Sequence, residues 1–388
     1  MITELSINSW EDLISSASKF IKSLRDGSKV LILYNGDPDG CASAVQLEII
    51  LENEKKKIKI KKHWVASYSY LFERELELIL RLKPEYLIFL DLPIIQEIQT
   101  LGQMSEITKA ILIYDHHNVS SRLKLPTNVL YLNSRVINGK VVRNDPTAYF
   151  TYCLGLRYGL NKNITKWLIG IGLIGDFALE NYPEILSSIS KYSPDLNKGK
   201  DIYDVRFRRI SGIINASYKY NPLKATHLAF DLLKEAYECE DPFLVFDEKN
   251  ANALKLQNIS RELKVEIDNE IKRFNKNKTE HGSSLLLTYA SQSKHFIAGI
   301  VAGISSGRYK DKIISVGFRY GHLMQNEIRV GEDSKIDLIK LLKNLSINYD
   351  CLSSGGHSKA AGALIEFREY RKFVEALNET VLRLEHEE

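Results

Sequence analysis

The 388-residue sequence has few cysteines and no long apolar run. Its four cysteines, Cys41, Cys153, Cys239 and Cys351, are too scattered for a zinc site and too few for a disulfide framework. No uninterrupted apolar run reaches membrane-spanning length, and the first residues lack the basic-then-apolar pattern of a signal peptide. We therefore expect a cytoplasmic protein without a membrane partner, and we assign the cysteines no role.

A strong excess of one charge sign is also absent. The formal net charge is only +4 at pH 7, which permits a polyanionic substrate but does not by itself indicate one. With 44% hydrophobic and 26% charged residues, the composition is typical of a globular protein. The chain is longer than one ordinary core requires, so we expect two domains.

Three short apolar runs in the first 120 residues each lead into acidic residues. Residues 29–34 lead into Asp37 and Asp39, residues 86–90 into Asp91, and residues 110–114 into Asp115, His116 and His117. Such runs are typical of buried parallel strands, whose carboxyl ends lie along one edge of a sheet and hold ligands there. If the strands are neighbours, their carboxylates would gather in a cluster that requires cations.

Helical periodicity alternates with these strands. We expect helices over residues 9–25, 42–51, 71–82, 146–158 and 165–176, and a further strand over 129–132. This alternation predicts an α/β fold with a doubly wound parallel sheet over residues 1–190. The lysine-rich segment 55–62 suits an exposed edge strand better than a surface that tracks a phosphate backbone, because lysine and isoleucine alternate.

The second half of the chain predicts a connecting region and a smaller domain. Residues 180–200 have a loop-like composition, 201–236 return to helical periodicity, and 246–278 keep one apolar helical face that could bridge two domains. We assign 191–280 to this helical region. Strands over 285–289, 313–318 and 363–367, with helices over 335–345 and from residue 370, predict a smaller α/β domain over 281–388.

The motifs resemble those of a known family. Asp37-x-Asp39-Gly40, the single Asp91 and Asp115-His116-His117 resemble the first three motifs of the DHH phosphoesterases, and Asp176 resembles the fourth. The run from Gly355 to Gly362 resembles the signature of the DHH-associated substrate domain. The family includes RecJ-type single-strand exonucleases, oligoribonucleases and cyclic-dinucleotide phosphodiesterases. All five signals occur in the family's order and cover nearly the whole chain.

The resemblance implies a centre of two Mn²⁺ ions, with Mg²⁺ as the alternative, because carboxylate and imidazole ligands suit Mn²⁺ well. The implied ligands are Asp37 for one ion, Asp39, His116 and Asp176 for the other, and Asp91 as a bridge between them. Such ions activate a water molecule for attack on phosphorus. His117 would donate a hydrogen bond to the phosphate or act as the acid that protonates the leaving group, and Asp115 would orient an imidazole. Taken singly, each acid also suits a turn or a helix cap.

Asn35 departs from the family's pattern. Members commonly carry His or Asp at this position, two residues before the first aspartate. Asn offers only a neutral carbonyl oxygen as a ligand. We therefore expect Asn35, if it is a ligand, to hold one ion more loosely or to require a higher metal concentration.

The substrate-binding candidates lie in the predicted second domain. They are Gly355, Gly356, His357, Lys359, Arg329, His295 and Arg308. The two glycines would let backbone amides approach a phosphate while His357 donates to it, although a packed glycine turn before a helix starting at Ala360 is an alternative. Arg329 resembles an arginine that grips phosphate, and His295 suits substrate contact and core packing equally. A second arginine, expected just after Ala302, is missing, and whether Arg308 replaces it is left open.

The resemblance implies a divalent-metal-dependent phosphodiesterase, and first of all a RecJ-like single-strand exonuclease. Its partner would be single-stranded DNA or RNA, digested from a 5′ end by family analogy, in DNA repair, replication or RNA turnover. Two alternatives remain open: an oligoribonuclease or cyclic-dinucleotide phosphodiesterase, and a catalytically weak cofactor of a replication helicase. A helicase or replisome protein is a further expected partner, by family analogy alone.

Overall fold

The computed structural model describes residues 9–65, 72–117, 124–137, 140–141, 145–160, 162–190, 206–220, 222–356 and 358–387. The chain divides into two compact units, Met1–Ser260 and Arg261–Glu388. The division falls inside the long helix α10 (Ala251–Asn277), so one helix contributes to both units. The helix lies within the predicted region 246–278.

The first unit is built on a five-stranded sheet with the order β2-β1-β3-β4-β5, in which every pair is parallel. Its strands are β1 (Lys29–Asn35), β2 (Lys59–Val65), β3 (Tyr86–Leu90), β4 (Ala110–Asp115) and β5 (Val129–Asn133). The three strands that precede the acidic motifs are parallel neighbours, which is the condition under which their carboxylates were expected to gather. They are almost wholly buried because helices cover both faces of the sheet. The predicted α/β fold class is confirmed.

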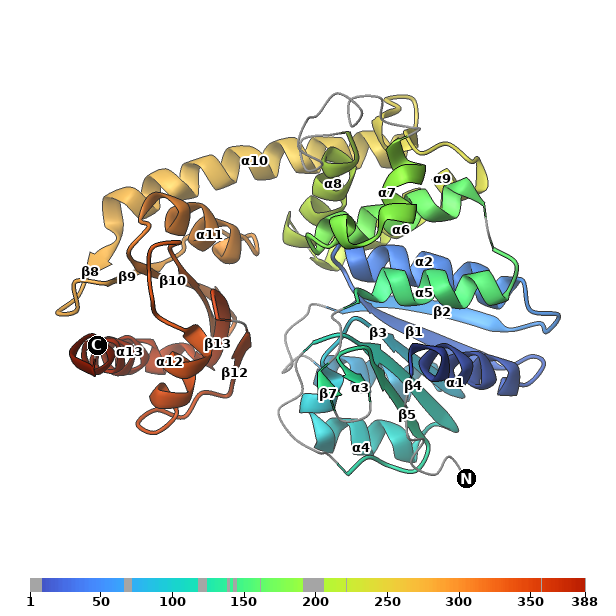
Figure 1. Ribbon diagram of the computed structural model, residues 1–388, viewed down its shortest axis with the longest axis horizontal. Helices are drawn as coiled ribbons and strands as arrows, with labels where there is room; N and C mark the ends of the chain where they lie inside the picture. Colours follow the sequence, from blue (N-terminus) through green and yellow to red (C-terminus); the bar gives the residue numbers. More distant parts are fainter. Residues whose placement is uncertain are drawn as a thin grey trace. The chain divides into compact units, whose positions relative to one another are not determined.

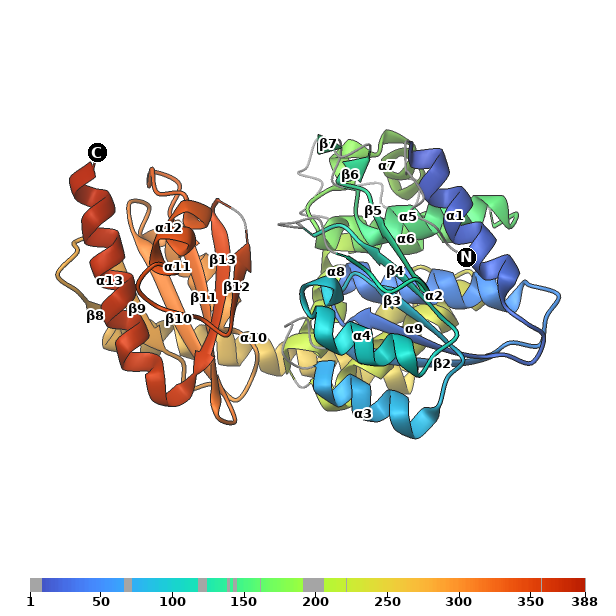
Figure 2. The same cartoon turned by 90° about the horizontal axis from the view of Figure 1, so that it is seen from below.

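Alternate strand residues face two separate cores. Leu31, Phe89 and Ile113 belong to the smaller core, which α3 and α4 cover, while Ile32 and Ile88 face the larger core on the opposite side (Figure 1, Figure 2). The helices of the smaller core are α3 (Phe72–Leu82) and α4 (Ile98–Glu106). Those of the larger core include α1 (Trp10–Ser23), α2 (Pro38–Glu52), α5 (Thr147–Arg157) and α6 (Asn163–Gly175).

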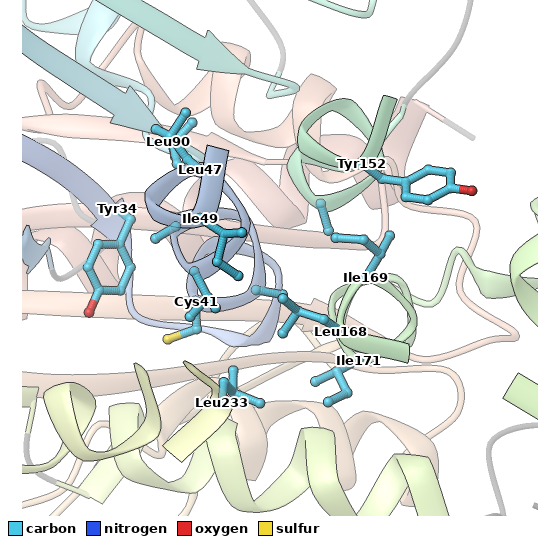
Figure 3. Packing of buried hydrophobic residues seen from close by; sticks show 14 of the residues in the cluster. Tyr34, Cys41, Leu47, Ile49, Leu90, Tyr152, Leu168, Ile169, Ile171 and Leu233 are labelled. Atoms are coloured by element: carbon cyan, nitrogen blue, oxygen red, sulfur yellow. The ribbon is translucent and has the colours of Figure 1, made fainter. Parts of the chain in front are cut away.

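Helix α2 lies at the centre of the larger core. Its residues 38–51 are all buried, so no side of the helix faces solvent along that length. Figure 3 shows Cys41 of α2 near Leu168 of α6 and Leu233 of α9 (Pro222–Glu238), and Leu47 of the same helix near Leu90 of β3. A helix that is enclosed in this way is held firmly, and its first turn therefore has a fixed position relative to the sheet.

Strand β2 is an edge strand of this sheet, as the lysine pattern predicts. It begins at Lys59, whereas the pattern placed its start at Lys55. Lys59 and Lys61 are exposed, while the ammonium of Lys62 lies 3.8 Å from the centre of the Phe230 ring. Charged residues along an exposed edge oppose pairing with another chain.

The prediction of a loop over residues 180–200 is wrong for the first half of that segment. Residues Pro183–Ser190 form helix α7, and Ile185 and Ile189 pack in the larger core. Proline is well tolerated in the first turn of a helix, so Pro183 marks a helix start, not a loop. Residues 191–200 lie outside the described residues. The helical periodicity over 201–236 corresponds to two helices, α8 (Arg206–Tyr220) and α9, and Pro222 is the first residue of the second.

The second unit contains a six-stranded mixed sheet with the order β12-β13-β11-β10-β9-β8. Its strands are β8 (Thr279–Glu280), β9 (Leu286–Ala290), β10 (Ile313–Tyr320), β11 (Leu323–Val330), β12 (Ser353–Gly356) and β13 (Ala360–Glu366). Helices α12 (Leu338–Leu345) and α13 (Tyr370–Glu387) cover one face, and α11 (Ala298–Arg308) packs against β10 and β11 (Figure 1). In the described part of the chain, no helix has the length and apolar content needed to cross a bilayer.

Candidate functional site

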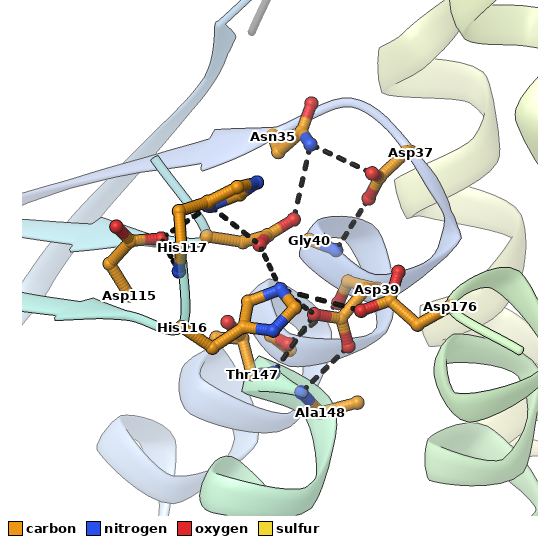
Figure 4. A network of polar contacts seen from close by, with 12 residues as sticks. Asn35, Asp37, Asp39, Gly40, Asp115, His116, His117, Thr147, Ala148 and Asp176 are labelled. Atoms are coloured by element: carbon orange, nitrogen blue, oxygen red, sulfur yellow. Dashed lines mark hydrogen bonds and ion pairs between the residues drawn. The ribbon is translucent and has the colours of Figure 1, made fainter. Parts of the chain in front are cut away.

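Acidic and imidazole side chains converge at the carboxyl ends of β1, β3 and β4 (Figure 4). His116, just after β4, is at the centre of the group. Its Nε2 atom lies 3.1 Å from Asp91 Oδ1, 3.3 Å from Asp176 Oδ2 and 3.9 Å from Asp39 Oδ2. Side chains that are up to 137 positions apart in the sequence therefore meet around one imidazole.

The turn between β1 and α2 positions the first two aspartates. Asp37 is the N-cap of α2, and its Oδ1 accepts a hydrogen bond of 2.9 Å from the Gly40 amide, while Pro38 occupies the first helical position. A Cβ atom at position 40 would lie 2.1 Å from the Asn35 carbonyl oxygen, so only glycine fits. The helix starts at Pro38, earlier than the predicted Ala42, and this places Asp39 in its first turn.

Asp39 is fully buried and is held by the start of α5. Its Oδ2 accepts a hydrogen bond of 2.9 Å from the Thr147 amide, and its Oδ1 accepts one of 2.8 Å from the Ala148 amide. The positive end of a helix stabilises a carboxylate in this position. Helix α6 also approaches closely: a Cβ atom at Gly172 would lie 2.7 Å from Ala148 Cβ and 3.2 Å from Asp39 Oδ1.

Asp91 has a strained backbone. Its φ of 59° lies in the left-handed region, which residues other than glycine rarely adopt. The residue is 1% exposed, and its amide donates a hydrogen bond of 3.0 Å to the Tyr114 carbonyl. Strain of this kind costs about 1 kcal/mol or more, and it occurs most often where function requires it.

His117 and Asp115 form a close pair. His117 Nδ1 lies 2.6 Å from Asp115 Oδ1 and 4.0 Å from Asp91 Oδ1. Burial lowers the pKa of His117, but the contact with Asp115 outweighs burial and raises this pKa to about 9. Burial acts to raise the pKa of Asp115, but His117 outweighs it and the pKa is lowered overall. The contact with Asp115 therefore favours the protonated form of the His117 imidazole.

The remaining carboxylates destabilise one another's negative charge. Burial and the nearby charges of Asp91 and Asp176 raise the pKa of Asp37 and of Asp39 well above the usual range. Burial likewise raises the pKa of Asp176 to about 6, although His116 acts in the opposite direction. A buried group with this much negative charge favours a cation as its counterion.

The donor atoms fit divalent cations. Two groups of three ligand atoms lie within 4.8 Å of one another: those of Asp39, His116 and Asp176, and those of Asp91, His116 and His117. Carboxylate oxygens with one or two imidazole nitrogens suit Mn²⁺ and, less well, Mg²⁺. The structure thus brings all five predicted metal ligands and Asn35 to one place. It also brings His117 within reach of an ion, which the sequence did not predict.

Two residues that the sequence analysis missed hold the histidines in position. The Arg135 Nε atom donates a hydrogen bond of 2.7 Å to the His116 carbonyl, and the Asn133 side-chain amide donates one of 3.0 Å to the His117 carbonyl. Both lie at or just beyond the end of β5, at the same edge of the sheet as the aspartates. The rule that located Asp91 and Asp115 could therefore have located them too.

The glycine motif of the second unit lies in an edge strand. Gly355 and Gly356 end β12, which pairs with β13 through Gly355–Gly362 and Gly356–Ala361. Gly356 has a φ of 145°, and a Cβ atom there would lie 2.4 Å from the Ala360 carbonyl oxygen, so this position requires glycine. The alternative of a helix starting at Ala360 is wrong, because this residue begins β13. His357 lies outside the described residues.

The other substrate-binding candidates have different surroundings. Arg329 of β11 lies 3.1 Å from Glu327 Oε2 and donates a hydrogen bond of 3.2 Å to the Ala361 carbonyl, beside the strand that follows the glycine motif. The Lys359 ammonium donates to the Ser334 carbonyl at 2.6 Å. His295 is buried, and Arg308 is exposed in the last turn of α11.

Comparison with known proteins gives a result at the level of structure alone. No family model matches the sequence, and no curated protein matches it either. The fold is similar to RecJ from Thermus thermophilus in complex with Mn²⁺, with a TM-score of 0.68 and 14% identity over 99% of this chain and 56% of that one. It is also similar to an exonuclease RecJ bound to manganese (TM-score 0.64, 17% identity, 95% and 94% coverage). CDC45 from Entamoeba histolytica is a further neighbour (TM-score 0.55, 10% identity, 96% and 99% coverage).

These similarities define the class of fold. The chain has the RecJ-like DHH architecture, in which a parallel-sheet unit is followed by a second unit with its own sheet. The chain spans 56% of the length of the Thermus protein but 94% of the second RecJ structure. The fold that the motif resemblance implies is therefore confirmed.

Replacing Arg135 with alanine tests its role in positioning. Without the bond to the His116 carbonyl the imidazole loses its fixed direction, and we expect Mn²⁺ affinity, measured calorimetrically, to fall about 10- to 100-fold. Arg157→Ala is the matched control, since this arginine is the last residue of α5 and pairs with Glu11 of α1. Equal Mn²⁺ affinity in both variants and the native protein would contradict the assignment.

Replacing Gly172 with alanine tests the close packing behind Asp39. The added methyl group would meet Ala148, and we expect the free energy of unfolding to fall by about 1–3 kcal/mol. Gly212→Ala in α8 is the control, because no atom lies within 4 Å of its added Cβ and alanine is the better helix former. Thermal unfolding should therefore give a lower melting temperature than that of the native protein for Gly172→Ala and a higher one for Gly212→Ala. A stabilised Gly172→Ala protein would refute the close contact.

Proposed function

We propose that the protein is a divalent-metal-dependent phosphodiesterase, and specifically a RecJ-like exonuclease that acts on single strands. The observation that carries this proposal is the position of His116 Nε2 within 4 Å of three carboxylates, those of Asp39, Asp91 and Asp176. The similarity to two RecJ structures that contain manganese supports both the class and the choice of Mn²⁺, with Mg²⁺ as the alternative ion.

The roles of the residues follow from their positions. As in the motif resemblance, Asp39, His116 and Asp176 would hold one ion, Asp37 would hold the other, and Asp91 would bridge the two. Bound ions of this kind activate water and neutralise charge on a phosphate. His117, whose protonated form the contact with Asp115 favours, would donate a hydrogen bond to a phosphate oxygen or a proton to the leaving group.

The second unit would bind the substrate's phosphates. Gly355 and Gly356 lie in an exposed edge strand, where backbone amides can approach a phosphate, and the Arg329 guanidinium lies beside the adjacent strand β13. We propose single-stranded DNA or RNA as the polymer, with digestion from a 5′ end, and a role in DNA repair, replication or RNA turnover that includes contact with a helicase or replisome protein.

Removing a ligand tests the reaction. We expect Asp91→Ala and His116→Ala each to abolish the manganese-stimulated release of mononucleotides from single-stranded DNA and RNA, because each substitution removes a metal-ligand atom. Glu332→Ala, a surface acid paired with Lys310, should remain as active as the native protein. Products from end-labelled strands, separated on a gel, report both the rate and the polarity. Undiminished cleavage by the two site variants would refute the proposal.

A hydrolase of very short oligonucleotides or cyclic dinucleotides is the second candidate. The Thermus RecJ is longer than this chain, but the chain covers 94% of the second RecJ structure, so length does not decide between the two candidates. We expect a single strand of about 20 nucleotides to be degraded with a higher kcat/KM than a dinucleotide, because a long strand occupies more of a binding channel. Steady-state kinetics on the two substrates distinguish the candidates, and faster turnover of the dinucleotide would favour the second.

A further inference from the structure

Asn35 lies between the two carboxylates that would share the second ion. Its Nδ2 atom donates hydrogen bonds of 2.7 Å to Asp37 Oδ2 and 3.1 Å to Asp91 Oδ2 (Figure 4). The residue is only 4% exposed, and among the described residues its Oδ1 atom has no hydrogen-bond partner. The amide therefore presents its donor side, not its potential ligand atom, to both acids.

This arrangement offsets part of the repulsion between Asp37 and Asp91. Each N–H group places a partial positive charge next to a carboxylate oxygen, in the way that a bound cation would. An amide nitrogen cannot coordinate a metal ion, because its lone pair is delocalised into the carbonyl group. For Asn35 to ligate an ion through Oδ1, the side-chain amide must rotate and give up both hydrogen bonds.

Among the described residues, no side-chain amide donates a hydrogen bond to Asp39 or Asp176, the carboxylates of the other ligand group. Asp39 is held by backbone amides of α5 that approach from one side, and its Oδ2 still faces His116. Asp176 retains 22% exposure of its side chain, so an ion can reach it from solvent. The ligand atoms of Asp39, His116 and Asp176 already lie within 4.8 Å of one another.

We propose that Asn35 makes the two ion positions unequal. The Asp39–His116–Asp176 position binds Mn²⁺ tightly, whereas at the Asp37–Asp91 position the amide of Asn35 competes with the ion and keeps its affinity low. The second ion then binds at the higher metal concentrations that displace the amide, or together with a phosphate. This inference rests on the proposed function, since it concerns the same centre.

The variant Asn35→Asp isolates the effect of the amide. An aspartate has no N–H donor and supplies a charged oxygen ligand, so the competition is removed and the position becomes a conventional carboxylate site. We expect its second Mn²⁺ ion to bind at least about tenfold more tightly than that of the native protein. Asn53→Asp, in the exposed C-cap of the same helix α2, adds the same charge far from the site and is the matched control.

Calorimetric titration with Mn²⁺ alone measures the two affinities, and electron paramagnetic resonance distinguishes isolated from adjacent ions. With one equivalent of Mn²⁺ the native protein and Asn53→Asp should give the six-line spectrum of an isolated ion. With two equivalents, only Asn35→Asp should give the broadened spectrum of a coupled pair. Two equally tight ions in the native protein, or no tightening in Asn35→Asp, would overturn the inference.

The same experiments separate this inference from the proposed function. If the native protein releases mononucleotides and binds two ions equally, the function stands and the role of Asn35 is wrong. If neither the native protein nor Asn35→Asp binds Mn²⁺ or cleaves a strand, both proposals fail. Because the titration reads ion binding directly, a change in activity is not needed to decide between them.

Discussion

Electrostatic repulsion among buried carboxylates is the constraint on which the first unit's local structure depends. Asp37, Asp39 and Asp91 would separate if the chain around them were loose, because water no longer screens their charges. Directed N–H groups oppose this: the start of α5 holds Asp39, and the Gly40 amide and Asn35 hold Asp37. The enclosed position of α2 is thus as much a part of the centre as the ligands are.

The sequence predicts the general plan well because the plan depends on side-chain types. Three apolar runs that end in acids indicate three parallel strands with acidic carboxyl ends, and the sheet order then brings β1, β3 and β4 next to one another. What the sequence cannot reveal is which backbone amides hold the acids. Thr147 and Ala148 act on Asp39 through main-chain N–H groups, and such donors have no signature in the side chains.

Element boundaries and polar strands account for some of the other differences. Proline at position 183 suggested a loop, although it begins a helix whose apolar residues reach the core. Strand β11 was not predicted because Gln325, Glu327 and Arg329 give it a polar face. Helix α11 covers that face closely because its second residue is a glycine: a Cβ at Gly299 would lie 3.2 Å from Glu327 Oε2. Local periodicity cannot show that a charged face will be covered by a distant helix.

The left-handed backbone of Asp91 limits how this position can change during evolution. Of the residues that tolerate such a conformation, glycine has no ligand atom, and asparagine has the shape but not the charge. Glutamate keeps the charge but adopts the conformation poorly. Almost every replacement at this position therefore loses either the backbone conformation or the charged oxygen atoms.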